Sequence, residues 1–240
     1  MRDPITFGNG ANTTVNRGRH SGALSLELLR VERAPEDGGA QRLLLHTNAG
    51  DITCRLHAAA DSNAAVLWVF GAGGGLGGPA GGLYTRLGRQ LVADGIASLE
   101  VAYRRPGDLL NCVLDVRLAI AYLGSLGRTR VVLVGHSFGG AVVVTAGATD
   151  EAVIGVAALS SQSYGTDLVD RLSPRPLFLA HGTADEVLPP TCSEDIYRRA
   201  KEPKQLVLYP GCRHGLDQCI EPLDRDLLAW IRVVVAAASA

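Results

Sequence analysis

From about residue 65 onward, apolar stretches suited to buried strands alternate with stretches that have helical spacing. Residues 65–70 form a continuous apolar run, which is typical of a strand buried on both faces. In residues 109–123, apolar side chains recur every three or four positions, as on one face of a helix. Because strands that alternate with helices usually pair in parallel, the pattern predicts an α/β fold. We expect a mainly parallel sheet with helices on both faces.

Residues 41–240 contain eight expected strands and five expected helices. The strands cover residues 43–47, 52–57, 65–70, 97–103, 131–134, 153–159, 176–180 and 205–209. The helices cover residues 84–93, 109–123, 140–148, 193–200 and 222–235. We therefore expect one domain over residues 41–240. A polar, partly irregular extension over residues 1–40 precedes it, with one strand near residues 24–31.

The charge and the apolar content of the chain exclude several classes of partner. With 23 basic and 24 acidic residues the net charge is −1, so we expect no groove for nucleic acid. The longest apolar runs are far short of the ~20 residues that span a membrane, and we expect no signal peptide. The five cysteines lack the spacing of a zinc site or a CxxC motif, so we expect reduced thiols in a cytoplasmic protein.

The string GHSFGG lies between a predicted strand and a predicted helix. In this context the pattern G-x-S-x-G presents a serine hydroxyl at the end of the sheet, with the serine in a strained backbone conformation. Gly135 and Gly139 carry no side chains that would obstruct the sharp turn. The amide of Phe138 begins the helix, where it can stabilise negative charge. Ser137 is therefore the candidate nucleophile, and the alternative is an ordinary glycine-lined turn.

Two further loops follow predicted strands and contain an acid and a base. The string HGTADEVLPP places Asp185 just after one strand, with Glu186 as the adjacent competitor. The alternative role for Asp185 is that of a turn or capping residue. The string YPGCRHGL places His214 just after the last strand. Since the carboxyl ends of parallel strands meet at one edge of a sheet, we predict that Ser137, Asp185 and His214 form a catalytic triad there.

The three strings together resemble the α/β-hydrolase superfamily, in which nucleophile, acid and histidine occur in this chain order. The resemblance covers roughly residues 42–238 and is nearest to the capless branch around dienelactone hydrolases and prolyl-oligopeptidase-like enzymes. Dienelactone hydrolases carry a cysteine as nucleophile, where this chain has Ser137. Only 16 residues separate Leu159 from Pro176, too few for the multi-helix cap of lidded relatives.

The resemblance implies a serine hydrolase that cleaves a small carboxylic ester through an acyl-enzyme intermediate. It implies no metal or organic cofactor, and a monomer or homodimer. Peptidase, thioesterase and lactonase activities would use the same triad. The alternative from a different class is a non-catalytic ligand-binding or scaffold protein on the same fold.

The glycine-rich stretch VFGAGGGLGGPAGG allows two interpretations. Gly73, Gly75 and Gly78 fit the G-x-G-x-x-G spacing of a dinucleotide site, with Glu100 as the acid that would bind a ribose. That motif normally begins its βαβ unit and leads directly into a helix. Here two strands precede it and residues 79–82 delay the helix, so we expect no nicotinamide or flavin cofactor.

The resemblance gives the stretch another role. In α/β-hydrolases the loop after the third core strand supplies one of the two backbone amides of the oxyanion hole, and the residue after the nucleophile supplies the other. By position the first donor is Ala72, with Gly73 as the alternative, and the second is Phe138. Phe70 stands where relatives often have a histidine.

Gly73, Arg104 and Tyr164 are the candidate substrate-binding residues. Arg104 follows a predicted strand, where it could bind an anionic group of the substrate. The alternative for Arg104 is an ion pair with Asp108 or Asp115. Tyr164 lies in the short segment between two predicted strands, where we expect a small flap beside an otherwise open site.

Overall fold

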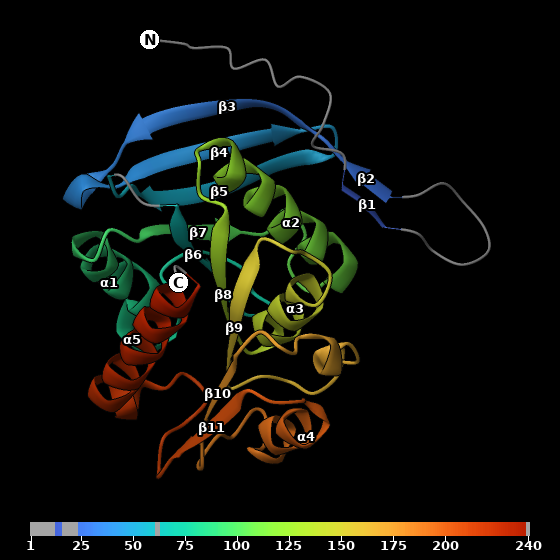
Figure 1. Ribbon diagram of the computed structural model, residues 1–240, viewed down its shortest axis with the longest axis vertical. Helices are drawn as coiled ribbons and strands as arrows, with labels where there is room; N and C mark the ends of the chain where they lie inside the picture. The colour runs from blue at the N-terminus through green and yellow to red at the C-terminus, as the bar shows by residue number, and fades with distance from the viewer. Residues whose placement is uncertain (1–12, 16–23, 61–62, 239–240) are drawn as a thin grey trace.

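The computed structural model describes residues 13–15, 24–60 and 63–238, and its main feature is a nine-stranded sheet with helices on both sides (Figure 1). The strands are β3 (Leu28–Pro35), β4 (Gln41–Thr47), β5 (Gly50–His57), β6 (Ala64–Val69), β7 (Ala97–Ala102), β8 (Arg130–His136), β9 (Val153–Leu159), β10 (Leu177–Gly182) and β11 (Lys204–Tyr209). The helices are α1 (Pro79–Ala93), α2 (Leu109–Ser125), α3 (Phe138–Gly147), α4 (Thr191–Arg199) and α5 (Ile220–Ala237). A separate antiparallel pair joins β1 (Thr13–Val15) to β2 (Leu24–Leu26).

The large sheet has the order β11-β10-β9-β8-β6-β7-β5-β4-β3. Strands β6 to β11 run parallel to one another. Strand β5 is antiparallel to β7, and β4 and β3 continue this antiparallel part of the sheet. The prediction of a mainly parallel α/β sheet is therefore confirmed.

The N-terminal side of the sheet differs from the expected eight strands. Strand β3 pairs with β4 from Leu28 opposite Thr47 to Pro35 opposite Gln41, and so adds a ninth strand. Most side chains of β3 are exposed, so the strand lacks the apolar alternation that marks an inner strand in the sequence. The boundary predicted at residue 40 falls inside this sheet, and residues 1–12 and 16–23 of the expected extension lie outside the described residues.

The helices cover the sheet as two groups, with α1 and α5 on one face and α2, α3 and α4 on the other (Figure 1). Strand β6 contributes side chains to the cores on both faces of the sheet, and all of them are buried. Ala65, Leu67 and Val69 pack in the core that contains α2 and α3, and the alternate side chains pack with α1 and α5. The run is continuously apolar because neither face of the strand meets water.

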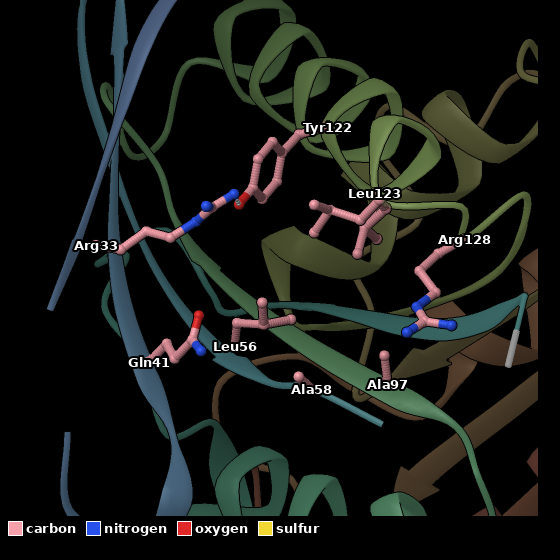
Figure 2. Close-up of a pocket in the computed structure, with 9 residues that line it drawn as sticks. Arg33, Gln41, Leu56, Ala58, Ala97, Tyr122, Leu123 and Arg128 are labelled. Carbon is pink, nitrogen blue, oxygen red and sulfur yellow. Dashed lines mark hydrogen bonds between the residues drawn. The ribbon is translucent and has the colours of Figure 1, made fainter. Parts of the chain in front are cut away.

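A cavity of about 270 Å³ lies between the C-terminal part of α2 and the antiparallel strands (Figure 2). Figure 2 shows Arg33 and Tyr122 pointing toward each other at one end and Arg128 at the other. Arg33 donates a hydrogen bond to the hydroxyl of Tyr122 (3.2 Å). Ala97, the first residue of β7, lies in the wall. The cavity is thus near the amino ends of the parallel strands, whereas ligand sites in such sheets form at the carboxyl ends.

Candidate active site

Three loops at the carboxyl edge of the parallel strands bring the predicted triad together. Ser137 directly follows β8, and Asp185 and His214 lie in the loops after β10 and β11. The Oγ atom of Ser137 lies 3.1 Å from Nε2 of His214, and Nδ1 of His214 lies 2.8 Å from Oδ2 of Asp185. Both are hydrogen-bond distances, so the three side chains form one hydrogen-bonded chain from hydroxyl to carboxylate. This arrangement can activate a serine as a nucleophile.

The turn that carries Ser137 depends on the absence of side chains at its neighbours. Ser137 has φ 57° and ψ −121°, a conformation that residues with a Cβ atom rarely adopt. A Cβ atom on Gly135 would overlap the carbonyl oxygen of Gly139, and one on Gly139 would overlap that of Phe70. The two glycines therefore let the chain turn sharply, and α3 starts directly after the serine.

Asp185 is enclosed and its carboxylate is surrounded by donors. Its side chain is 0% exposed. Oδ1 accepts hydrogen bonds from the amides of Val187 (2.9 Å) and Leu188 (2.8 Å), while Oδ2 accepts from His214. Nε2 of His181 lies 3.1 Å from the same Oδ2. Burial raises the pKa of Asp185, but the hydrogen bonds from the amides and from His214 more than offset this, so its pKa lies below the ordinary value and the group is charged.

The hydrogen bonds also decide the tautomer of His214. The carboxylate of Asp185 has no proton to donate, so Nδ1 of His214 carries one and donates it. Nε2 is then the acceptor that faces the hydroxyl proton of Ser137. The side chain of His214 is 16% exposed, so the base can be reached from solvent while its acid partner cannot.

His136 packs behind the triad and joins the end of β8 to the loop that carries His214. The centroids of the two rings are 4.9 Å apart, and Nε2 of His136 donates to the backbone carbonyl of His214 (2.9 Å). Burial is the main reason that the pKa of His136 is lowered to about 4, so its ring is uncharged near neutral pH. This contact holds the backbone of His214 beside Ser137.

A disulfide between Cys212 and Cys219 closes the loop that contains His214. It corrects the expectation of reduced thiols, because the loop folds back and brings the two Cα atoms to 5.9 Å, a distance that a disulfide spans. The other three cysteines, Cys54, Cys112 and Cys192, are free thiols. Disulfides persist mainly in oxidising surroundings, and the cytoplasmic location expected from the sequence stays a prediction.

The residues predicted to form the oxyanion hole lie on two segments near Ser137. The amide of Phe138 is the first of α3, and the first amides of a helix have no partner within it. The loop of Ala72 approaches from the end of β6, where a Cβ atom on Gly71 would lie 3.8 Å from Oγ of Ser137. Within the described chain, the amide of Ala72 donates to no protein acceptor. A Cβ atom on Gly73 would have no neighbour within 4 Å, so the loop is open to solvent there.

Glu100 connects the second half of the glycine-rich loop to the sheet. Its side chain is 1% exposed. The carboxylate accepts hydrogen bonds from the amide of Gly77 (2.6 Å), the hydroxyl of Thr85 (2.7 Å) and Arg55 (3.3 Å). A buried carboxylate with these partners is not available to a ribose, which argues against the dinucleotide interpretation. The loop is instead anchored at Gly77.

Two predicted substrate-binding side chains differ in exposure. The side chain of Arg104 is 3% exposed, and its Nε donates to Asp115 (2.5 Å), which is one of the ion pairs named as the alternative. A buried and paired guanidinium cannot bind a substrate anion, so Arg104 is corrected to a structural residue. Tyr164 is 81% exposed in the segment after β9. Val169 and Leu172 of that segment are buried in the core, so it does not form the expected flap.

Sequence reasoning passed over His181 and Ser193. Nδ1 of His181 lies 2.7 Å from Oγ of Ser193, and Nε2 of His181 lies 3.0 Å from the carbonyl oxygen of Leu188. The available signal was position, because His181 lies near the end of β10, four residues ahead of Asp185. The partner Ser193 belongs to α4 and could not be identified before the packing of that helix was known.

Two other kinds of feature are absent from the described residues. No three His, Cys, Asp or Glu side chains among them are grouped so as to hold a metal ion. None of the helices they form is long and apolar enough to cross a bilayer.

The chain matches curated proteins that are themselves named as uncharacterized. It is 34% identical over 118 residues to the protein YfhR of Escherichia coli strain K12, a match that covers 40% of this chain and 42% of that protein. YfhR of Salmonella typhi is 40% identical over 57 residues, which are 23% of this chain and 20% of that protein. The matches thus span less than half the length of these relatives. No protein-family model matches the chain.

Solved structures share the fold. The esterase domain of a Rhodothermus marinus protein has a TM-score of 0.67 and 21% identity, over 82% of this chain and 99% of that one. Est1E of Butyrivibrio proteoclasticus, solved with ferulic acid bound, has a TM-score of 0.67 and 17% identity, over 78% and 96%. XC6422 of Xanthomonas campestris, an α/β serine hydrolase without a lid, has a TM-score of 0.66 and 19% identity, over 82% and 95%. At these identities the likeness concerns the fold.

Proposed function

We propose, from the lidless α/β-hydrolase fold that this chain has, that it is a serine hydrolase which cleaves a carboxylic ester. The observation that carries the proposal is the hydrogen-bonded chain from Ser137 through His214 to Asp185, with links of 3.1 Å and 2.8 Å. The strained backbone of Ser137 supports it, because strain of this kind is concentrated at sites that use it.

Each member of the triad has a defined task in this reaction. His214 takes the hydroxyl proton of Ser137 on Nε2 while Oγ attacks the ester carbonyl, and Asp185 stabilises the imidazolium. The amides of Phe138 and Ala72 donate to the oxyanion, and each such donor is worth about 2.7–4 kcal/mol in the transition state. The bond to the alcohol oxygen then breaks, and His214 gives its proton to the departing alcohol. Water deprotonated by His214 hydrolyses the acyl-serine and restores the hydroxyl.

The surroundings of the triad favour a small or medium ester in an open site. Val187, in the acid loop, exposes 61% of its surface and offers apolar contact to an acyl group. Tyr164, after β9 and 81% exposed, stays a predicted substrate contact. One of the structural neighbours is an esterase domain by name, and another, Est1E, was solved with ferulic acid bound. These points support an ester ahead of a peptide, a thioester or a lactone.

A fluorophosphonate probe, followed by mass spectrometry of the adduct, tests the proposal. The probe reacts with activated serines, so we expect an adduct on Ser137 that is lost in Ser137→Ala. Ser161→Ala is the matched control, because this buried serine follows the neighbouring strand β9 and hydrogen-bonds to the carbonyl of Gln162. A folded protein without an adduct on Ser137 would instead indicate a non-catalytic protein on this fold.

A panel of related acyl compounds then separates the ester from its alternatives. p-Nitrophenyl esters of increasing acyl length, the matching thioester and anilide, and a lactone share the carbonyl chemistry and differ in the leaving group. We expect the highest kcat/KM for short or medium esters, and a loss of about 10⁴-fold or more in Ser137→Ala. Higher kcat/KM for another member of the panel would assign the protein to that class.

A further inference from the structure

His181 is a buried side chain beneath the acid loop that the triad does not include. It lies in β10, is 0% exposed, and precedes Asp185 by four residues. Its Nε2 faces two oxygens, the carbonyl of Leu188 at 3.0 Å and Oδ2 of Asp185 at 3.1 Å. Its Nδ1 lies 2.7 Å from the hydroxyl of Ser193, which is also buried. Both ring nitrogens are therefore engaged within the protein.

These neighbours decide which nitrogen of His181 carries the proton. Two oxygen acceptors face Nε2, so Nε2 carries the hydrogen, and Nδ1 accepts the hydroxyl proton of Ser193. The titratable groups that interact with the ring are Asp185, His214 and His136. Burial is the main reason that the pKa of His181 is lowered, so the ring is uncharged near neutral pH. The side chain next to Asp185 is thus an uncharged ring with a fixed N–H group.

We propose that His181 is a positioning residue for Asp185, whose Nε2–H closes the acid loop at Leu188 and shares Oδ2 of the carboxylate with the Nδ1–H of His214. The role in catalysis rests on the proposed function, whereas the geometry exists without a substrate. The other carboxylate oxygen is held by the amides of Val187 and Leu188, so His181 completes the set of donors that prevents rotation of the carboxylate.

Sharing one oxygen between two rings also adjusts the strength of the acid. A donor at Oδ2 disperses part of the negative charge of Asp185, so the carboxylate stabilises the protonated form of His214 less than an unshared one would. His181 would thus fix the orientation of the Asp185 carboxylate and make His214 a weaker base. A residue that only filled space would do neither.

The unmodified protein provides the first test. NMR of the ring nitrogens should find His181 as the Nε2–H tautomer throughout the pH range in which His214 takes up its proton. An Nδ1–H tautomer, or a His181 ring that takes up a proton together with His214, would overturn the proposal. This measurement needs neither turnover nor a substitution, so it decides the matter even where a variant does not fold.

Three variants provide the second test. His181→Leu removes the N–H group, His181→Gln retains an N–H donor, and His57→Gln makes the same change at a buried histidine in β5, away from the triad. In His181→Leu we expect kcat to fall about 10–100-fold with little change in KM, because the acid is less well oriented. We expect the acid limb of kcat/KM to move to higher pH, because Asp185 loses a competing donor. His181→Gln should retain most of the activity, and His57→Gln should match the wild type.

The two proposals fail in different ways. The Nδ1–H proton of His214 can be followed by NMR without substrate. This signal reports the midpoint pH at which the ring takes up its second proton, and we expect that pH to rise in His181→Leu. If the fluorophosphonate leaves Ser137 unlabelled but this midpoint moves, the proposed function fails and the positioning role stands. If Ser137 is labelled while folded His181→Leu keeps the wild-type kcat and pH profile, the positioning role fails alone.

Discussion

The two sides of the triad are held in place by different means. The acid side, residues 181–190 and 209–219, is joined by hydrogen bonds between loops, such as that from the amide of Ala184 to the carbonyl of Cys212 (2.9 Å), and by the Cys212–Cys219 disulfide. The side proposed to bind the oxyanion (the oxyanion side), residues 70–78 and 135–140, is held by backbone packed so closely that a Cβ atom on Gly139 would overlap Phe70.

In the proposed reaction the two sides present different groups to a substrate, and this accounts for the difference. The acid side must orient side chains, and a side chain is oriented by filling its hydrogen-bonding positions, as at Asp185. The oxyanion side must present backbone amides, and an amide can approach a reacting atom only where no side chain stands in the way. The acid side should therefore tolerate the loss of a bond better than the oxyanion side tolerates an added atom.

The largest effect is expected from a single carbon added to the oxyanion side. In Gly139→Ala the new Cβ atom would overlap the carbonyl oxygen of Phe70 and lie 2.9 Å from that of Val69. Neither backbone can move without opening β6 or the serine turn, so we expect a loss of about 3 kcal/mol or more in the free energy of unfolding. Urea unfolding measures this loss.

Gly124→Ala is the control for that experiment. Gly124 lies in α2, and a Cβ atom there would have no neighbour within 4 Å. Alanine has the higher helix propensity, so this variant should be as stable as the wild type or more stable. Equal stabilities for the Gly139 and Gly124 variants would show that the oxyanion side is not held by close backbone packing.

The meeting of Ser137, Asp185 and His214 could be predicted from the sequence, because each residue follows its own strand and parallel strands end at one edge. The mainly parallel sheet was equally predictable from continuous apolar runs such as β6. Both inferences need only local patterns and a general rule of sheet topology. They require no knowledge of which side chains pack together.

The supporting contacts could not be predicted in that way. The pairing of His181 with Ser193 depends on how α4 packs against β10, and the Cys212–Cys219 disulfide depends on how its loop folds back. The ninth strand β3 is mostly exposed at the sheet edge, so its sequence has no core pattern. Such features arise from tertiary packing, which local periodicity does not encode.

An effect of similar size is expected at the junction of the two sides. His136 belongs to the oxyanion side by position and donates to the backbone of His214 on the acid side. Its pKa is about 4 in the folded protein and about 6.5 in an unfolded chain. Between these values the unfolded chain binds a proton that the folded protein does not, so stability falls as the pH falls. For this one group the loss is about 3 kcal/mol.

His136→Gln isolates that contribution, since glutamine keeps an N–H donor and cannot titrate. Urea unfolding from about pH 7 to about pH 4 should show a shallower loss of stability for the variant than for the wild type. Parallel curves would mean that folding does not lower the pKa of His136, and in acid the two sides would then be joined by a charged contact.

The smallest effect is expected where a hydrogen bond, and not packing, supports the oxyanion side. Glu100 accepts a hydrogen bond from the amide of Gly77, so Glu100→Gln should loosen the loop that contains Ala72 and lower kcat about tenfold, or about 1.4 kcal/mol. Glu36→Gln is the matched control, because Glu36 also pairs with Arg55 (2.8 Å). It removes the same charge and should leave kcat unchanged. Steady-state kinetics on the best ester compares the two. If Glu100→Gln and Glu36→Gln have equal kcat values, backbone packing alone holds Ala72 in place, and side-chain hydrogen bonds do not contribute to the oxyanion side.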